Sequence, residues 1–229
     1  YSNIVLSKLK SNHGINVICS KTEYGSFVGE KPTIDEIEEY SCILNEEIDK
    51  YPKGFLSSIG IENIVLTKNL SSESMIVSGL SLYKELIFNV IVNDRSIVIH
   101  HEIFHAIEKK HGFLELNCIE SDSFSSIAIV KLGPKRLSDP IEYKAHLYAY
   151  MIVYPDFIER LSMKDKNLKF KIQSIVNFLS GIGLNLKHKN SAIECNSPNN
   201  LESNAQKRQS EYIFVKKRPL VDKSRKWVL

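Results

Sequence analysis

The chain has 229 residues, of which 43% are hydrophobic and 25% are charged, and its formal net charge at pH 7 is +3. This composition predicts one medium-sized globular domain, with or without an appendage. No apolar run reaches the roughly 18–20 residues that a membrane-spanning helix needs, and so small a net charge gives no reason to expect nucleic-acid binding. The cysteines are far apart and form no CxxC pair, which argues against a cysteine-based zinc site and gives little support for a disulfide framework; they are Cys19, Cys42, Cys118 and Cys195.

The first part of the chain predicts short strands followed by a helix. Ile4 to Leu9 and Ile15 to Ile18 are interpreted as short strands, with His13 as an exposed loop residue between them. A helix is expected to start at Thr33, which can form a capping box with Glu36, and to end before Pro52. Its apolar residues follow helical spacing and its glutamates are expected on a solvated face. The apolar residues are Ile34, Ile37, Tyr40, Leu44, Ile48 and Tyr51, and the glutamates are Glu38, Glu39, Glu46 and Glu47.

The next segments predict a small, mostly antiparallel sheet that leads into a helix. Strands are expected at 64–66, 75–83 and 86–92, separated by mostly polar residues. A turn follows, and a helix is expected up to His111, with Asp94 or Ser96 as its N-cap and Gly112 as its C-terminal stop.

This helix contains His101-Glu102-Ile103-Phe104-His105, which is the H-E-x-x-H pattern. Helix positions four apart lie on the same face, so His101 and His105 can direct two imidazoles at one point. Glu102 is adjacent to the first histidine and can reach a water bound to the same ion. Two neutral nitrogen ligands beside a carboxylate base are the arrangement of a hydrolytic zinc site. The pattern therefore predicts Zn²⁺ as cofactor, His101 and His105 as ligands, and Glu102 as general base.

Beyond Gly112 the chain predicts a long loop, two helices and a polar tail. The loop, up to about residue 137, is expected to lead back towards the metal. A helix is expected from Pro140 to Val153 with Asp139 as N-cap, and another over 168–184. We expect residues 1–185 to form the domain and 186–229 to form a polar linker and a basic tail. The tail is either a strand with a solvated end or a docking patch for an acidic partner, a membrane surface or nucleic acid.

A catalytic zinc ion needs a third protein ligand and one open position for water. The candidates on the later helix are Glu142, His146 and Asp139. Glu142 also has a purely structural interpretation, because with Asp139 as N-cap it stands where a capping-box glutamate would stand. His111 is the remaining candidate, but Glu108 occupies the position at which a glycine would let the chain turn back to the metal.

These residues resemble a known family. The run His100-His-Glu-Ile-Phe-His105, followed by Asp139-Pro-Ile-Glu-Tyr-Lys-Ala-His-Leu-Tyr-Ala149, resembles the zinc-binding metallopeptidases related to the catalytic domain of lethal-factor-type toxins. The resemblance covers residues 33–153. It implies an α+β, zincin-like fold with a small twisted sheet, an active-site helix and a second ligand-bearing helix. It also implies that Glu142 is the third zinc ligand.

The second helix is also similar to that of the bacterial regulatory zincins that cleave repressors. Their pattern, E-x-x-A-N-x-F-A-x-x-L-L-x-P, matches Glu142, Ala145 and Pro155, and His146 stands where those proteins have asparagine. Both resemblances nominate Glu142.

The chain departs from the toxin-type pattern in the group that would stabilise the oxyanion. That family has a tyrosine shortly before the third ligand, and residues 130–137 contain none. Lys135, Arg136, Tyr143 and His146 are the candidates to replace it, and we assign His146 a catalytic role beside Glu102.

The predicted function is zinc-dependent hydrolysis of peptide bonds in a protein substrate. The alternative, motivated by the missing tyrosine, is a zincin-shaped binding module without turnover. The family resemblance raises secretion, or delivery as an effector, as the localisation to consider. The chain begins at Tyr1 without a signal-peptide pattern, so the sequence itself leaves export open.

Overall fold

The computed structural model describes residues 2–73, 75–116, 121–132 and 139–184. The chain divides into two units, Tyr1–His188 and Lys189–Leu229. The second unit lies outside the described residues, as do the polar linker and the basic tail expected at 186–229. The boundary near residue 185 therefore stays a prediction, and the fold below is that of the first unit.

The first unit has an α+β fold, as the sequence predicts. Within the described residues the strands form one sheet in the order β2-β3-β4-β7-β6, with β1 and β5 also paired to β4. Most pairings are antiparallel, as expected, whereas β4 pairs in parallel with β1 and with β7. The strands are β1 (Asn16–Cys19), β2 (Thr22–Tyr24), β3 (Phe27–Glu30), β4 (Asn63–Ser72), β5 (Met75–Ile76), β6 (Gly79–Ser81) and β7 (Glu85–Asn89).

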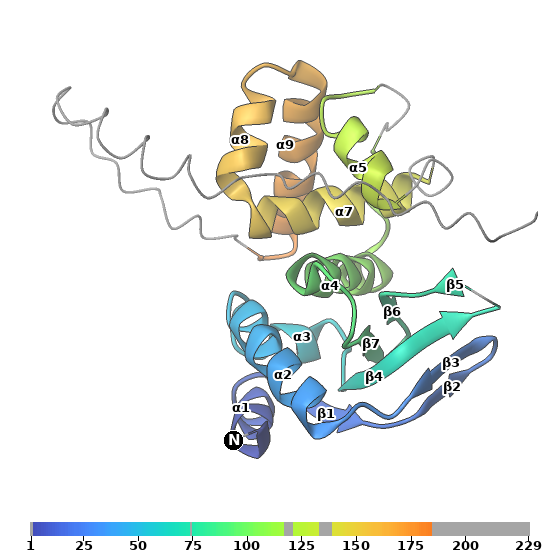
Figure 1. Cartoon of the computed structure of the whole chain (residues 1–229). Coiled ribbons are helices and arrows are strands. Elements are labelled where there is room, and N and C mark those ends of the chain that lie inside the picture. The colour runs from blue at the N-terminus through green and yellow to red at the C-terminus, as the bar shows by residue number, and fades with distance from the viewer. Residues whose placement is uncertain (1, 74, 117–120, 133–138, 185–229) are drawn as a thin grey trace, which may run out of the picture. The chain divides into compact units, whose positions relative to one another are not determined.

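The helices pack in two groups with α4 between them. Figure 1 shows α4 with the sheet and α1 to α3 on one side, and with α7, α8 and α9 on the other. The helices are α1 (Ser2–His13), α2 (Ile34–Ile48), α3 (Phe55–Ser58), α4 (Arg95–His111), α5 (Ser125–Leu132), α7 (Pro140–Val153), α8 (Pro155–Ser162) and α9 (Lys166–Gly181). None of these described helices is both long and apolar enough to cross a membrane.

Helix α4 is buried along most of its length because other elements cover it on both sides. It packs against α2, β6, β7 and α7. Ile99, Ile103, Phe104 and Ile107 have no exposed surface and belong to the main core. A helix covered in this way presents polar side chains to other protein groups, so its histidines need partners from neighbouring elements.

The start of α2 confirms the predicted capping box. Thr33 Oγ1 accepts a hydrogen bond from the Glu36 backbone N–H at 3.3 Å, and Glu36 Oε2 accepts one from the Thr33 backbone N–H at 2.6 Å. Tyr40, Leu44 and Ile48 are fully buried on the core side of the helix. Ile34 was expected on the same face but is exposed, because it lies in the first turn, beyond the edge of the core.

The N-terminal segment differs from its prediction. Ile4 to Leu9 lie in α1 and not in a strand, because a short apolar run does not distinguish the two structures. His13 was expected to be exposed, but it is buried and its Nε2 lies 3.3 Å from Asp49 Oδ1. The strand expected at 15–18 is present as β1.

Two helices in the second half of the chain were not predicted. Ser125–Leu132 forms α5 inside the segment that was expected to be a loop. Pro155 was interpreted as the end of the preceding helix, and it also stands at the first position of α8, where proline fits because the first helical N–H has no intrahelical partner.

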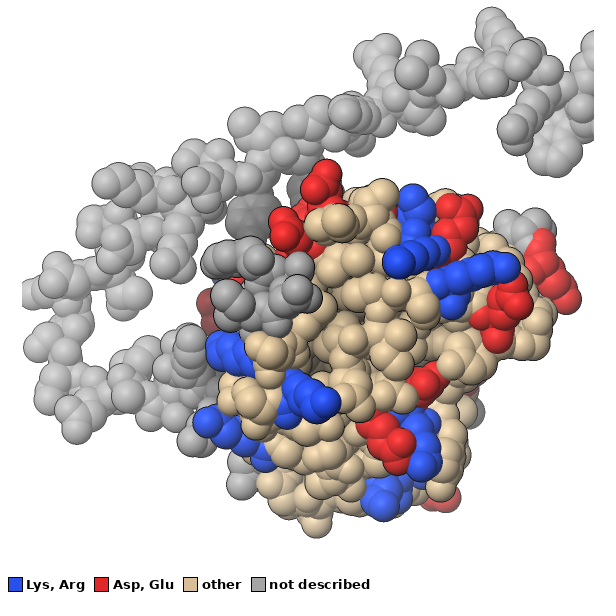
Figure 2. Space-filling model, turned by 90° about the horizontal axis from the view of Figure 1, so that it is seen from below, with Lys and Arg blue, Asp and Glu red and all other residues tan. Residues whose placement is uncertain are grey.

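The face shown in Figure 2 carries charges of both signs. Lys and Arg side chains alternate with Asp and Glu side chains around an uncharged area, and neither sign gathers into one broad patch on this face.

Candidate metal centre

The candidate site lies between α4 and α7, which pack against each other. His101 and His105 come from α4, and Glu142 comes from the first turn of α7. The N-cap of α7 is Asp139, as predicted, and its carboxylate accepts a hydrogen bond from the Ile141 backbone N–H at 2.9 Å. The Glu142 carboxylate points across to α4.

The three side chains converge with distances that suit a tetrahedral zinc site. The Nε2 atoms of His101 and His105 lie 3.0 Å apart, and Glu142 carboxylate oxygens lie 3.4 Å from the first and 3.6 Å from the second. In a tetrahedral site with bonds of about 2.0–2.1 Å, neighbouring ligand atoms are about 3.3 Å apart. The three donor atoms therefore fit one small cation, and they form the one His/Cys/Asp/Glu group of this kind among the described residues.

The electrostatics of the site favour the neutral form of His105. Burial, followed by the neighbouring His101, lowers the pKa of His105 well below its usual value. Metal ligation requires the neutral imidazole, because the protonated ring has no free lone pair on Nε2. The Nε2 atoms of His101 and His105 are 3.0 Å apart, and they cannot both donate a hydrogen bond to each other. A cation between them would accept a lone pair from each nitrogen and from the Glu142 carboxylate.

The structure separates the other third-ligand candidates from the cluster. The Asp139 side chain is exposed and caps α7. His111 is the last residue of α4 and is exposed, because the helix continues through Glu108. His146 lies beside His101 with the ring centroids 5.9 Å apart, outside the three converging groups. Lys135 and Arg136 lie outside the described residues.

Glu102 lines a cavity of about 150 Å³ next to His101. Gly79 at the start of β6 lies directly against this carboxylate: a Cβ there would lie 2.9 Å from Glu102 Cγ and 3.0 Å from Val98 Cγ1. The close approach of β6 to α4 therefore requires glycine at this position. The cavity is lined by Ser78, Gly79, Asn93, Asp94, Ile97, Val98, His101, Glu102, His146 and Tyr150.

Aromatic side chains of α7 form the wall of this cavity opposite α4. His146 and Tyr150 follow Glu142 at intervals of one helical turn, and all three lie on one face of α7. The ring centroids of His146 and Tyr150 are 5.0 Å apart, and both rings contact Phe124. Tyr150 was not predicted to line the site. Its spacing of four residues from His146 and eight from Glu142 is the sequence signal that it lies on the same face of α7.

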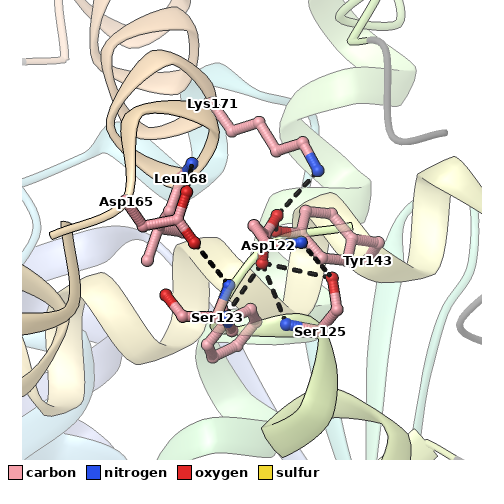
Figure 3. A network of polar contacts seen from close by, with 8 residues as sticks. Asp122, Ser123, Ser125, Tyr143, Asp165, Leu168 and Lys171 are labelled. Atoms are coloured by element: carbon pink, nitrogen blue, oxygen red, sulfur yellow. Dashed lines mark hydrogen bonds and ion pairs between the residues drawn. The ribbon is translucent and has the colours of Figure 1, made fainter. Parts of the chain in front are cut away.

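Tyr143 was one of the candidates to replace the tyrosine that stabilises the oxyanion, but its hydroxyl is bonded to Asp122. Figure 3 shows it in a polar network centred on Asp122. The Tyr143 hydroxyl donates to Asp122 Oδ2, which also accepts a hydrogen bond from Lys171 Nζ at 2.6 Å. Asp122 Oδ1 accepts hydrogen bonds from the backbone N–H groups of Phe124 and Ser125, both at 2.9 Å, where α5 starts. One carboxylate thus joins α5, α7 and α9 behind the candidate site.

A buried ion pair holds α4 to α7 close to Glu142. Lys144 Nζ lies 2.5 Å from Glu108 Oε1 and 2.6 Å from the Leu114 carbonyl oxygen. The side chain of Glu108 has no exposed surface and that of Lys144 is only 3% exposed. Glu108 also accepts a hydrogen bond from the Leu114 backbone N–H at 3.0 Å. This pair fixes the contact between the two helices that carry the converging groups.

A second buried network fixes the rotation of α4 about its axis. His100 Nε2 lies 2.6 Å from Glu47 Oε2, and His100 Nδ1 lies 2.7 Å from the Tyr51 hydroxyl. Glu47 was expected on a solvated face, and this expectation was wrong because its partner is far away in the sequence. Burial opposes ionisation of Glu47, but hydrogen bonds from His100 and Lys50 lower its pKa to about 2. With His100 held towards α2, the next residue, about 100° further round the helix, faces α7.

Comparisons with known proteins do not identify a family for this chain. No protein-family model, curated protein or solved structure matches the chain. The three converging groups, Glu102 and the cavity beside them are the features of the chain that point to a function.

Proposed function

We propose that the chain is a zinc-dependent metallopeptidase of the zincin type, which hydrolyses peptide bonds of a protein substrate. The observation that carries the proposal is the convergence of His101, His105 and Glu142 beside Glu102. Three protein ligands with a carboxylate and a cavity next to them are typical of catalytic zinc sites. Structural zinc sites instead use four protein ligands.

In the proposed reaction, zinc and the side chains have different roles. When bound, zinc supplies a Lewis acid that polarises a carbonyl and lowers the pKa of a water. His101 Nε2, His105 Nε2 and the Glu142 carboxylate would hold it. Glu102 accepts a proton from the attacking water and donates it to the amine that leaves. The buried surroundings of Glu102, which is 7% exposed, strengthen its electrostatic interactions with groups in the cavity.

The position of β6 supports an extended peptide as substrate. Among the described strands β6 pairs only with β7 and ends the sheet. An extended peptide can add to such an edge through main-chain hydrogen bonds. Because Gly79 of β6 lies against Glu102, a peptide on this edge would pass over the candidate site.

Metal analysis tests the proposal most directly. We expect about one zinc per chain in protein purified without chelator, and we expect it to be lost in His101→Ala and in Glu142→Ala. The physical reason is that each substitution removes one of only three protein ligands. The measurement is elemental analysis, with circular dichroism to check that each variant is folded.

Two variants serve as matched controls, because each removes one of the other third-ligand candidates. Asp139→Ala and His111→Ala should retain zinc. Zinc kept in Glu142→Ala would contradict its assignment as a ligand. Wild-type protein that binds no zinc, even after zinc is added, would exclude the enzyme and leave a zincin-shaped binding module.

A side chain at Gly79 should disturb Glu102 without affecting zinc. In Gly79→Ala the new Cβ displaces the carboxylate or the strand, and a misplacement of about 1 Å costs up to about 100-fold in rate. We expect kcat for a peptide substrate to fall by about 10–100-fold while the zinc content stays unchanged. Gly181→Ala is the control, because an added Cβ there meets nothing within 4 Å. Unchanged kcat in Gly79→Ala would show that this contact does not position Glu102.

A further inference from the structure

Tyr51 lies in the short segment between α2 and α3, where both its backbone and its ring are held. Its backbone N–H donates a hydrogen bond to the Ile48 carbonyl oxygen at 3.0 Å, at the end of α2. Its ring stacks on that of Phe55 in α3, with the ring centroids 5.7 Å apart and an interplanar angle of 5°. Tyr51 is buried and belongs to the main core. Its hydroxyl therefore has a fixed position in the interior.

The Tyr51 hydroxyl joins α7 to α4. It accepts a hydrogen bond from the Tyr148 hydroxyl of α7 at 3.0 Å, and it lies 2.7 Å from His100 Nδ1 of α4. Burial raises the pKa of Tyr51 well above its usual value, so the hydroxyl keeps its proton. Because the Tyr51 oxygen accepts from Tyr148, its own O–H is directed to His100 Nδ1. The Nε2–H of His100 then donates to Glu47, and one chain of hydrogen bonds runs from α7 through Tyr51 to α4 and α2.

Both residues bonded to Tyr51 are close along their helices to groups of the candidate metal centre. His100 directly precedes His101 on α4, and Tyr148 follows Glu142 by six residues on α7. Neither helix can rotate about its axis without breaking its hydrogen bond to Tyr51. The same rotation would move a group of the metal centre, since the side chains of one helix turn together.

The hydroxyl also adds a second polar contact between the two helices that carry the converging groups. The buried Lys144–Glu108 pair already joins them, but a single contact allows two helices to pivot about it. Tyr148 lies one helical turn after Lys144 on α7, so the contact through Tyr51 restricts this pivoting. A metal site tolerates little such movement, because the distances from ligands to the ion must stay within about 0.2 Å of their usual values.

We propose that Tyr51 is a positioning residue for the metal centre, whose hydroxyl holds α4 and α7 in the relative orientation at which the three ligand side chains converge. Tyr51 contacts neither the ion nor the substrate and acts through His100 and Tyr148. The inference rests on the proposed function only as far as the metal site. It applies equally to a peptidase and to a binding module that holds zinc.

The test compares the zinc affinity of Tyr51→Phe with that of Tyr40→Phe. Each substitution removes one buried phenol hydroxyl and keeps the ring. Tyr40 lies on α2 and is fully buried, and its hydroxyl has no hydrogen-bond partner among the described residues. Residues that orient metal ligands typically change metal affinity by about 10- to 100-fold when they are lost. We expect the Kd for zinc, measured by competition with a chromophoric chelator, to rise by about that factor in Tyr51→Phe and to stay unchanged in Tyr40→Phe.

Cobalt(II) in place of zinc provides a readout of the geometry of the site. Its visible absorption depends on the number and arrangement of the ligands. We expect the bands of cobalt-loaded Tyr51→Phe to differ from those of the wild type. A residue that only stabilised the fold would leave the spectrum of the folded protein unchanged.

Tyr148→Phe is a second and milder variant, because it breaks the link to α7 and keeps the hydrogen bond between Tyr51 and His100. It should raise the Kd for zinc in the same direction. The double variant Tyr51→Phe, Tyr148→Phe should bind zinc no more weakly than Tyr51→Phe alone, since both substitutions break one shared hydrogen bond.

Circular dichroism shows which variants are folded, and Tyr148→Phe serves as the test if Tyr51→Phe does not fold. Unchanged Kd and cobalt spectra in the folded variants would overturn the role of Tyr51 and leave the proposed function standing. Weaker zinc binding in Tyr51→Phe would support that role even if the wild type hydrolysed no peptide, a result that contradicts only the proposed function. A wild type that binds no zinc would overturn both.

Discussion

Glu102→Gln should abolish most of the activity while leaving zinc bound. General acid–base groups contribute about 10²- to 10⁴-fold to rate, and Gln cannot accept the proton of the attacking water. The substitution keeps the size of the side chain, so the contact with Gly79 is preserved. We expect kcat to fall by about 10²- to 10⁴-fold, with one zinc per chain retained by elemental analysis.

The retained zinc separates this effect from loss of the metal. Glu46→Gln is a suitable control because it removes an exposed carboxylate on α2. Full activity in Glu102→Gln would show that another group accepts the proton. Loss of zinc in the same variant would instead mean that Glu102 helps to hold the ion.

Lys144→Met should give the largest loss of stability. Removing one partner of a buried ion pair leaves an uncompensated charge and costs about 3–5 kcal/mol. Glu108 would be that charge, since its side chain has no exposed surface. The Leu114 carbonyl would also lose its hydrogen bond from Lys144. The free energy of unfolding, measured with urea, should fall by about 3–5 kcal/mol.

A double substitution distinguishes the charge from the loss of packing. Glu108→Gln together with Lys144→Met removes both charges and keeps an acceptor for the Leu114 N–H. It should therefore be more stable than Lys144→Met alone. Lys169→Met, at an exposed position on α9, should change stability by less than about 0.5 kcal/mol. Equal losses in the single and the double variant would show that the ion pair is not the cause.

The parts of the fold that the sequence predicts are those with local signals. Helix α2 has its capping box, α4 has a glycine stop, and α7 has an aspartate cap followed by proline. The buried states of His13 and Glu47 were missed, because their partners Asp49 and His100 are distant in the sequence. No local pattern reports a contact of that kind.

The candidate site was predictable to the extent that it lies on one helix. The spacing of His101 and His105 places both on one face of α4 without further information. Spacing alone left the third group open, since it depends on how α7 crosses α4, and Glu142 was nominated by the resemblance. The Lys144–Glu108 pair joins the two helices, and it is a contact between segments whose relative position no spacing rule gives. The sequence could also have predicted that Tyr150 lines the cavity, because it follows Glu142 and His146 at the same interval of four residues.

The position of Lys171 has a consequence for the order in which the protein matures during synthesis. Domains form from the N-terminus onward as the chain leaves the ribosome, so both histidines of α4 emerge well before α9. Asp122 and the Tyr143 ring make their contacts with Lys171 only after Lys171 has been synthesised. The nascent chain thus carries His101 and His105 before the contacts of Asp122 are complete.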